Sequence, residues 1–214
     1  MFRVVSSGFL CFLLLIATSA EARKKHHAPP EFDYYLLSLS WAPNYCASHP
    51  SDHSSECAAG NHTAFVLHGL WPQSDNGAPP MSCSPASPVA KNIVDHMLQF
   101  MPSRGLIQHE WEKHGTCSGL SAADYFAKVE QAFKNVQIPH DYRDLKQNKT
   151  FDLVDIESSF SSKNHAPRNA FRISCHAGDL VGLEVCLNKN LEYQACTQSV
   201  RECPSSQVLM RPTM

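Results

Sequence analysis

Residues 109–115 read His-Glu-Trp-Glu-Lys-His-Gly, and most of the side chains in this run can gain or lose a proton. If the segment winds as a helix, side chains three and four residues apart lie on one side of the turn. That set comprises His109, Glu110, Lys113 and His114. Two imidazoles, a carboxylate and an ammonium group pack poorly in an apolar core. The segment therefore predicts a helical site that binds an anion and transfers protons.

A second histidine-bearing segment lies upstream, where residues 68–72 read His-Gly-Leu-Trp-Pro. It closes the apolar run Ala64-Phe65-Val66-Leu67, which is typical of a short buried strand. We expect this strand to deliver His68 at its end.

The order of the remaining segments predicts an α+β domain. Residues 32–41 alternate and are rich in aromatic side chains, which favours a strand, while 171–175 and 180–187 read as a hairpin. Apolar residues spaced by four from Val89 predict a helix that ends by Pro102, and a shorter helix is expected over 153–160. Ser121 and Asp124 resemble a capping box before another helix. That helix carries an apolar stripe assigned to the core: Tyr125, Val129, Phe133 and Val136. Residues 46–60 and 74–88 are expected to be loops. Because strands and helices do not alternate regularly, the sequence favours one α+β domain.

The first 22 residues predict an export signal. Arg3 supplies a positive charge, 8–17 form a short apolar segment, and Ala20-Glu21-Ala22 fits a cleavage site. The basic, proline-ended segment 23–30 is expected to be a flexible tail, which leaves 31–214 as the folded domain. The apolar segment is shorter than the roughly 20 residues that span a bilayer, so we expect no membrane association after signal removal. A monomer is expected.

Cysteine content agrees with export. The chain has nine cysteines, of which Cys11 lies in the expected signal, so eight remain. An even number in an exported chain predicts disulfides, although eight cysteines allow about 105 pairings. Cys46 and Cys57 are close enough in the sequence to staple the polar segment around them.

The charge balance excludes a polycationic nucleic-acid-coating protein, because the formal net charge is −2 at pH 7. The chain also has twelve histidines, many of which would be charged near pH 5. We assign no task to nine of them.

Rival chemistries fit the histidine segments poorly. A zinc-binding H-E-x-x-H motif needs a second histidine four residues after the first. Lys113 occupies that position here, and a protonated lysine cannot bind a metal. Cys117 follows His114 closely, but a thiol that belongs to an even disulfide set cannot act as a nucleophile. The sequence has neither a G-x-S-x-G elbow nor a phosphate-binding G-x-x-x-x-G-K-[ST] loop.

General acid–base chemistry on an anionic substrate remains. One neutral histidine can accept a proton while a protonated one donates, and Lys113 can balance charge on a phosphorane-like transition state. A phosphodiester beside a 2′-hydroxyl carries its own nucleophile and needs no metal or other cofactor. RNA has that hydroxyl and DNA lacks it.

Both histidine segments resemble the active-site segments of the ribonuclease T2 family. The similarity extends to residues 35–46, which resemble the family's first strand, and to 171–203, which resemble its disulfide-bearing terminal part. Essentially the whole chain after the expected signal is covered. The resemblance implies a single disulfide-stabilised α+β domain with an antiparallel central sheet packed by several helices. It also implies a secreted, metal-independent endoribonuclease that cleaves single-stranded RNA through a 2′,3′-cyclic phosphate, followed by hydrolysis to 3′-phosphate ends.

The resemblance also implies roles for individual residues. His114 matches the general base and His68 the general acid, and the two exchange roles when the cyclic phosphate is hydrolysed. His109, Glu110 and Lys113 match the residues that hold the phosphate and stabilise the pentacovalent state.

Two further positions concern base recognition. Trp71 matches an aromatic residue at a base-binding pocket, although a tryptophan beside a buried strand is equally typical of packing. Gln73 stands where some relatives carry an acidic residue that recognises the base, which leaves the base preference open.

The resemblance narrows the disulfide pairing as well. It implies Cys83–Cys117, and Cys175–Cys203 enclosing Cys186–Cys196, which leaves Cys46–Cys57 as the fourth bridge.

Two matters stay open at this point. The alternative function is a catalytically inactive relative that acts as a secreted toxin or recognition protein, but such chains usually lose one of the paired histidines. Export can end outside the cell, in the periplasm, or in a lysosome or vacuole.

Overall fold

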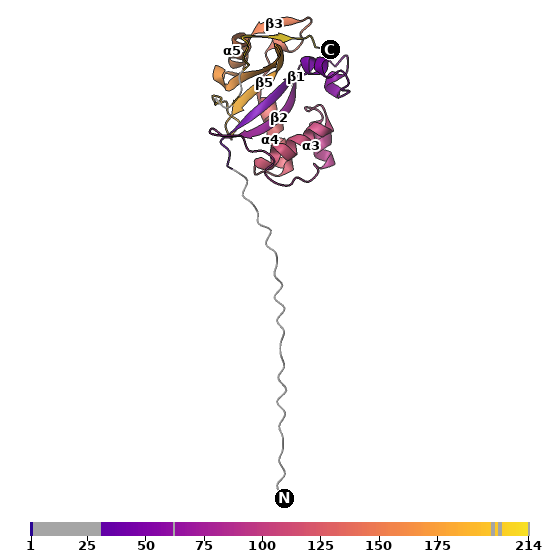
Figure 1. Cartoon of the computed structure of the whole chain (residues 1–214), viewed down its shortest axis with the longest axis vertical. Coiled ribbons are helices and arrows are strands. Elements are labelled where there is room, and N and C mark those ends of the chain that lie inside the picture. Colours follow the sequence, from indigo (N-terminus) through magenta and orange to yellow (C-terminus); the bar gives the residue numbers. More distant parts are fainter. Residues whose placement is uncertain (2–30, 62, 198–199, 201–202, 214) are drawn as a thin grey trace.

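The protein folds around one six-stranded sheet. The structure is a computed structural model that describes residues 1, 31–61, 63–197, 200 and 203–213 (Figure 1). The predicted export signal and basic tail, apart from Met1, lie outside the described residues. The main strand order is β2 (Phe65–Gln73), β1 (Tyr34–Trp41), β5 (Asp179–Leu187), β6 (Gln207–Met210), β3 (Lys149–Asp152), and β4 (Phe171–His176) also pairs with β5. All pairings are antiparallel except β5 with β6. The expected α+β class is therefore confirmed.

Five α-helices and four short 3₁₀ helices accompany the sheet in the described part of the chain. The α-helices are α1 (Ala42–Ser48), α2 (Lys91–Met97), α3 (Arg104–Lys113), α4 (Ala122–Asn135) and α5 (Leu153–Asn164). The 3₁₀ helices are η1 (Ser55–Cys57), η2 (Gly115–Cys117), η3 (His140–Tyr142) and η4 (Arg168–Ala170). Figure 1 shows α3 and α4 on the β2 side of the sheet, with α5 and β3 at the opposite side.

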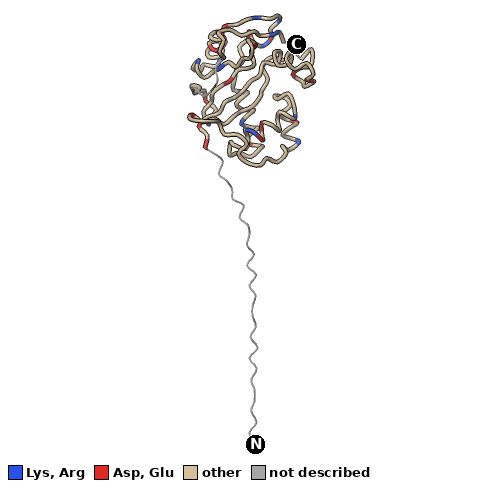
Figure 2. Tube along the Cα trace, in the orientation of Figure 1, with Lys and Arg blue, Asp and Glu red and all other residues tan. Residues whose placement is uncertain are grey.

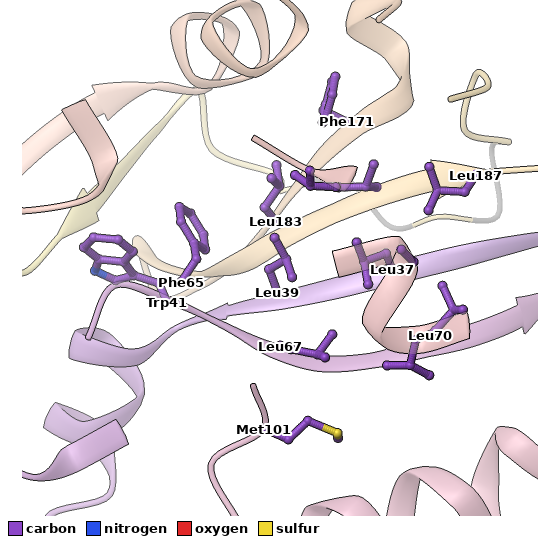
Figure 3. Packing of buried hydrophobic residues seen from close by; sticks show 14 of the residues in the cluster. Leu37, Leu39, Trp41, Phe65, Leu67, Leu70, Met101, Phe171, Leu183 and Leu187 are labelled. Atoms are coloured by element: carbon purple, nitrogen blue, oxygen red, sulfur yellow. The ribbon is translucent and has the colours of Figure 1, made fainter. Parts of the chain in front are cut away.

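Side-chain alternation along the strands separates a core face from a second, more polar face. On β1, Leu37, Leu39 and Trp41 join the main core, which also contains Leu183 of β5 and Phe171 of β4 (Figure 3). The intervening β1 residues point to the other face. There, a small apolar cluster contains Tyr34, Leu36, Cys186 and Val200, with Trp71 packed against it. The polar face of β1 also carries Ser38 and Ser40, and it is on this side that the histidine of β2 emerges.

His68 lies in the interior of a strand, and the expectation that it ends one is wrong. β2 continues through Trp71 to Gln73, because those residues pair with the full length of β1. The register joins Ser38 to Gly69 and Leu39 to Leu67, so His68 is the extra residue of a β-bulge. Bulges redirect side chains and are frequent beside active sites. The bulge thus gives His68 its own orientation on an otherwise regular edge strand.

The helix that carries the second histidine segment begins with a cap and stops before its last histidine. The Ser103 hydroxyl accepts a hydrogen bond from the Leu106 N–H at 3.1 Å, which satisfies a free donor of the first turn. α3 ends at Lys113, and His114 is its C-terminal cap with φ −117° and ψ −44°. The His114 N–H still donates to the Glu110 carbonyl at 3.0 Å. His114 therefore keeps its place near Glu110 although η2 follows directly.

The remaining helix predictions vary in accuracy. The Ser121 cap of α4 is confirmed, with its hydroxyl accepting from the Asp124 N–H at 3.2 Å. Of the predicted stripe, Tyr125 and Val129 are buried on α4, whereas Val136 is buried just beyond its end.

Other boundaries differ from the expected ones. α5 begins at the predicted Leu153 but runs four residues past Phe160, to Asn164. The predicted loop 46–60 is wrong at its start, because α1 runs through Cys46 to Ser48. α1 begins directly after β1, where a proline in the first turn favours a helix start. The sequence pattern also missed β3 and β6.

All four predicted disulfides are present: Cys46–Cys57, Cys83–Cys117, Cys175–Cys203 and Cys186–Cys196. Cys117 is therefore unavailable as a nucleophile, in agreement with the rejection of thiol chemistry.

Charged residues of both signs are scattered along the described chain, as the small net charge implies (Figure 2). Among the described helices, none is long and apolar enough to cross a membrane.

Candidate active site

The bulged His68 of β2 is held from two sides. Its Nδ1 lies 3.2 Å from the Ser40 hydroxyl on the neighbouring strand β1. Its Nε2 lies 3.4 Å from Oε1 of Glu110, which comes from α3. The His68 side chain is 38% exposed, so substrate can reach it. This arrangement suits a histidine that exchanges a proton with a bound molecule.

Glu110 connects the two histidine segments. Its side chain is 1% exposed, and its Oε2 accepts a hydrogen bond from Trp71 Nε1 at 2.7 Å. Its Oε1 is buried and has no hydrogen-bond partner among the described residues, apart from the ion-pair distance to His68. A buried carboxylate oxygen without a donor is costly, so it favours a protonated neighbour or a bound donor.

Trp71 lies between the two histidines. Its ring stacks on that of His114, with centroids 5.0 Å apart and 24° between the planes. The Trp71 ring also meets the His68 ring edge-on, with centroids 5.6 Å apart and 86° between the planes. Trp71 therefore fixes both imidazoles as well as Glu110, a packing role that explains much of its position.

His114 has the more buried imidazole. The residue is 7% exposed, and its Nδ1 is buried without a hydrogen-bond partner in the described part of the chain. Burial lowers the pKa of His114 to about 4, against the opposing effect of Glu110 and with smaller lowering effects of Lys113, His109 and His68. At pH 5 most of this imidazole is neutral and can accept a proton.

Gly69 allows α3 to approach β2 closely. A Cβ at this position would lie 1.9 Å from Glu110 Oε2 and 2.7 Å from Trp71 Nε1. The hydrogen bond from Trp71 Nε1 to Glu110 Oε2 therefore requires glycine at position 69.

The end of α3 is tied to the loop after β2. Cys83–Cys117 links this loop to η2, and the Ser82 N–H donates to the Lys113 carbonyl at 2.8 Å. The Cys83 N–H donates to the Thr116 hydroxyl at 3.1 Å. These three connections restrain the segment that presents His114.

The other predicted site residues are placed less closely. His109 is exposed and Lys113 is half-buried on α3, and both are near enough to His114 to influence its pKa. Gln73 is 7% exposed at the end of β2, and no contact joins its side chain to the histidine cluster. The structure thus brings together His68, Trp71, Glu110 and His114, with His109 and Lys113 at the margin.

A cavity of about 640 Å³ is lined by His68 but by none of Trp71, Glu110 and His114. It is lined by β1 and β2 on one wall and by the disulfide-bridged segment from Asn44 to Glu56 on another. No group of three or more His, Cys, Asp or Glu side chains in the described residues is arranged to hold a metal ion.

A family model described as the Ribonuclease T2 family matches residues 32–196, which is more than half of the chain. The chain belongs to this family. The matched range includes every residue of the histidine cluster and all of β1, β2, β4 and β5.

Individual relatives agree with the T2 family assignment. A ribonuclease from Aeromonas hydrophila is 47% identical over 95 residues, which make up 44% of this chain and 42% of that protein. This chain therefore spans less than half the length of the Aeromonas protein. Ribonuclease DdI from Dictyostelium discoideum is 29% identical over 218 residues, covering 92% of this chain and 91% of that protein. Among solved structures, trichomaglin, described as a novel S-like ribonuclease, matches with a TM-score of 0.72 at 25% identity, covering 86% of this chain and all of that one.

Two polar neighbours of the T2 histidine cluster were not predicted from the sequence. Ser40 alternates with the apolar residues of β1, so the sequence predicts that it lies on the polar face of the strand. Its contact with His68 could not be predicted, because it depends on the bulge in β2. Glu184 of β5 is half-buried, and burial raises its pKa to about 7 while His68 opposes the rise. No sequence signal indicated that β5 brings this carboxyl close to His68.

The disulfide beside the cluster gives a testable prediction. Replacing both Cys83 and Cys117 by alanine should lower the free energy of unfolding by about 2–5 kcal/mol, because the bridge closes a long loop. It should also lower any turnover at saturating substrate, because the end of α3 loses a restraint. Denaturant unfolding and kcat measurements on the same samples check both effects. Removing Cys175 and Cys203 instead should reduce stability with kcat retained, because neither cysteine belongs to the apolar cluster that packs against Trp71. Equal losses of kcat in both variants would contradict the positioning role.

Proposed function

We propose that the chain is an exported endoribonuclease that cleaves single-stranded RNA without a metal or other cofactor. Its products would be 2′,3′-cyclic phosphates and then 3′-phosphate ends. The observation that supports this most strongly is the pair of histidines around Trp71 and Glu110, of which one is buried and neutral and the other is exposed beside a carboxylate. The proposed mechanism cleaves RNA and not DNA, because the nucleophile is the 2′-hydroxyl that DNA lacks.

In the proposed first step, His114 removes the proton from the 2′-hydroxyl, and the resulting oxygen attacks the adjacent phosphorus. His68, protonated and beside Glu110, donates its proton to the departing 5′-oxygen. One P–O bond forms and one breaks, so the product is a cyclic diester and a free 5′-hydroxyl. Water then opens the cyclic ester with the two histidines in exchanged roles.

The surrounding residues support these transfers. Lys113 and His109 would hold the phosphate oxygens and balance the charge of the pentacovalent state. Glu110 would hold the His68 cation, and its hydrogen bond to Trp71 fixes the carboxylate. Trp71 acts as a positioning residue for both imidazoles. We also propose that Trp71 and Gln73 contact a base of the substrate.

Export follows from the same proposal. Four disulfides fit an oxidising compartment, and the expected signal over residues 1–22 would direct the chain there. A tomato relative, 27% identical over 180 residues, is named extracellular ribonuclease LE. We propose that the exported domain over 31–214 acts as a monomer.

Digestion of a defined RNA oligomer tests the proposal directly. Purified protein should produce cyclic phosphate and then 3′-phosphate ends, identified by mass, with equal rates in the presence and absence of EDTA. Activity that EDTA abolishes and zinc restores would overturn the metal-independent mechanism.

The lowered pKa of His114 predicts the acid side of the pH profile. The general base must be unprotonated, so kcat/KM for RNA should fall with a midpoint near pH 4. An ordinary histidine would produce this fall near pH 6.5. Initial rates between pH 3 and pH 8 at low substrate measure it. An acid limb centred near 6.5 would contradict the assignment of the buried His114 as the base.

A further inference from the structure

The cavity beside His68 contains a buried carboxyl group that the proposed mechanism does not use. Glu56 lies in η1, is 8% exposed, and lines this cavity together with His68 and Ser40. The next residue is Cys57, whose disulfide to Cys46 ties η1 to α1. Glu56 is therefore fixed in place and faces a space large enough for a ligand.

The neighbouring acid, Asp52, is already engaged within the protein. Its carboxylate accepts from the Tyr45 hydroxyl at 2.7 Å and from the Ser54 N–H at 2.7 Å. Glu56 has the Ser54 hydroxyl nearby, but an ionised carboxylate offers about four acceptor sites. Glu56 thus keeps hydrogen-bonding capacity that points to a ligand in the cavity.

The position of His68 beside the cavity indicates which part of an RNA substrate would bind there. In the proposed reaction His68 delivers a proton to the 5′-oxygen of the departing nucleotide. His68 contacts Trp71, which stacks on His114, and His68 also lines the cavity, whose lining includes neither Trp71 nor His114. The nucleoside attached to the departing oxygen therefore enters the cavity that Glu56 lines.

We propose that Glu56 determines base specificity for the nucleotide attached to the departing 5′-oxygen, by pairing its carboxyl group with the Watson–Crick edge of that base. This inference rests on the proposed ribonuclease function. Guanine presents two adjacent donors, N1–H and N2–H, which match the two oxygens of an ionised carboxylate. Adenine, cytosine and uracil each place an acceptor beside a donor, so the ionised form pairs with them less well.

The protonation state of Glu56 changes this match. Burial raises the pKa of Glu56 to about 7, Asp52 adds to the rise, and His68, Ser54 and His49 oppose it. A protonated carboxyl presents one donor and one acceptor, which any of the four bases can satisfy. The preference for guanine is accordingly weak at pH 5 and grows as pH rises through 7.

Other ionisable groups also line the cavity. Tyr45 and Asp179 belong to α1 and β5, and His176 ends β4. Asp179 accepts from Arg211 at 2.6 Å, so its charge is paired, and Tyr45 donates to Asp52. His49 lines the cavity as well, and burial and Asp52 are the largest causes of the raised pKa of Glu56.

Dinucleoside monophosphates test the proposal. The ratio of kcat/KM for CpG to that for CpA should rise on the order of tenfold between pH 5 and pH 8. Both substrates use the same histidines, so the protonation of the catalytic groups cancels in the ratio. In Glu56→Gln the ratio should be independent of pH, because the amide presents one donor and one acceptor throughout.

Glu184→Gln is the matched control, because burial also raises the pKa of Glu184 to about 7 but its side chain lines a different cavity. This variant should keep the pH-dependent ratio. A constant ratio in the active wild-type protein would overturn the role of Glu56, as would a ratio in Glu56→Gln that still changes with pH. Failure of the wild-type protein to cleave either substrate would instead overturn the proposed function and the inference together.

Discussion

Replacing His114 by alanine should lower kcat/KM for RNA on the order of 10³-fold, and replacing His68 should have an effect of similar size. General acid–base catalysis contributes roughly 10²–10⁴-fold at each proton transfer, and no other described histidine is placed to substitute. His109 is the nearest alternative, but it lies on the exposed side of α3. Initial-rate kinetics on a defined RNA measure both losses.

His140→Ala is the control for these variants, because His140 is almost fully exposed and distant in sequence from either histidine segment. It should keep normal kinetics. Circular dichroism and thermal unfolding should show that all three variants fold. Near-normal turnover in folded His114→Ala or His68→Ala would refute the histidine pair.

Replacing Gly69 by alanine should lower kcat/KM by 10²-fold or more although the change adds one methyl group. The added Cβ would lie 1.9 Å from Glu110 Oε2, where no atoms can coexist, so the carboxylate must leave Trp71. Both histidines contact this unit, and a displacement of about 1 Å at a catalytic group can cost that much in rate.

Gly105→Ala provides the matched control on α3. Its Cβ would meet no atom closer than 4.0 Å, and alanine favours a helix. This variant should therefore retain kcat/KM and gain slightly in stability. Wild-type kinetics in Gly69→Ala would show that the Glu110–Trp71 contact does not position the site.

The sequence allowed the histidine cluster to be predicted because its members lie within two short segments of regular structure. Glu110 and His114 are four residues apart, so one helical turn brings them together, although His114 itself caps α3. The disulfide pairing followed from the family resemblance. The bulge at His68 was beyond this reasoning, since it depends on how β2 registers against β1 rather than on either strand alone.

Long-range pairing also explains the elements that the pattern missed. β3 and β6 are four residues each and pair with one another across more than fifty residues of sequence, so neither has a local signal. Glu56 was hidden for the same reason, because its segment reads as a polar loop and only the fold around His68 gives that loop a cavity to line.

The most direct test of the central claim uses a DNA oligomer that contains a single ribonucleotide. The proposed mechanism predicts cleavage only on the 3′ side of that ribonucleotide, with a 2′,3′-cyclic phosphate on one fragment and a 5′-hydroxyl on the other. Cleavage of the matching all-DNA oligomer, or fragments that end in 3′-hydroxyl and 5′-phosphate groups, would contradict it.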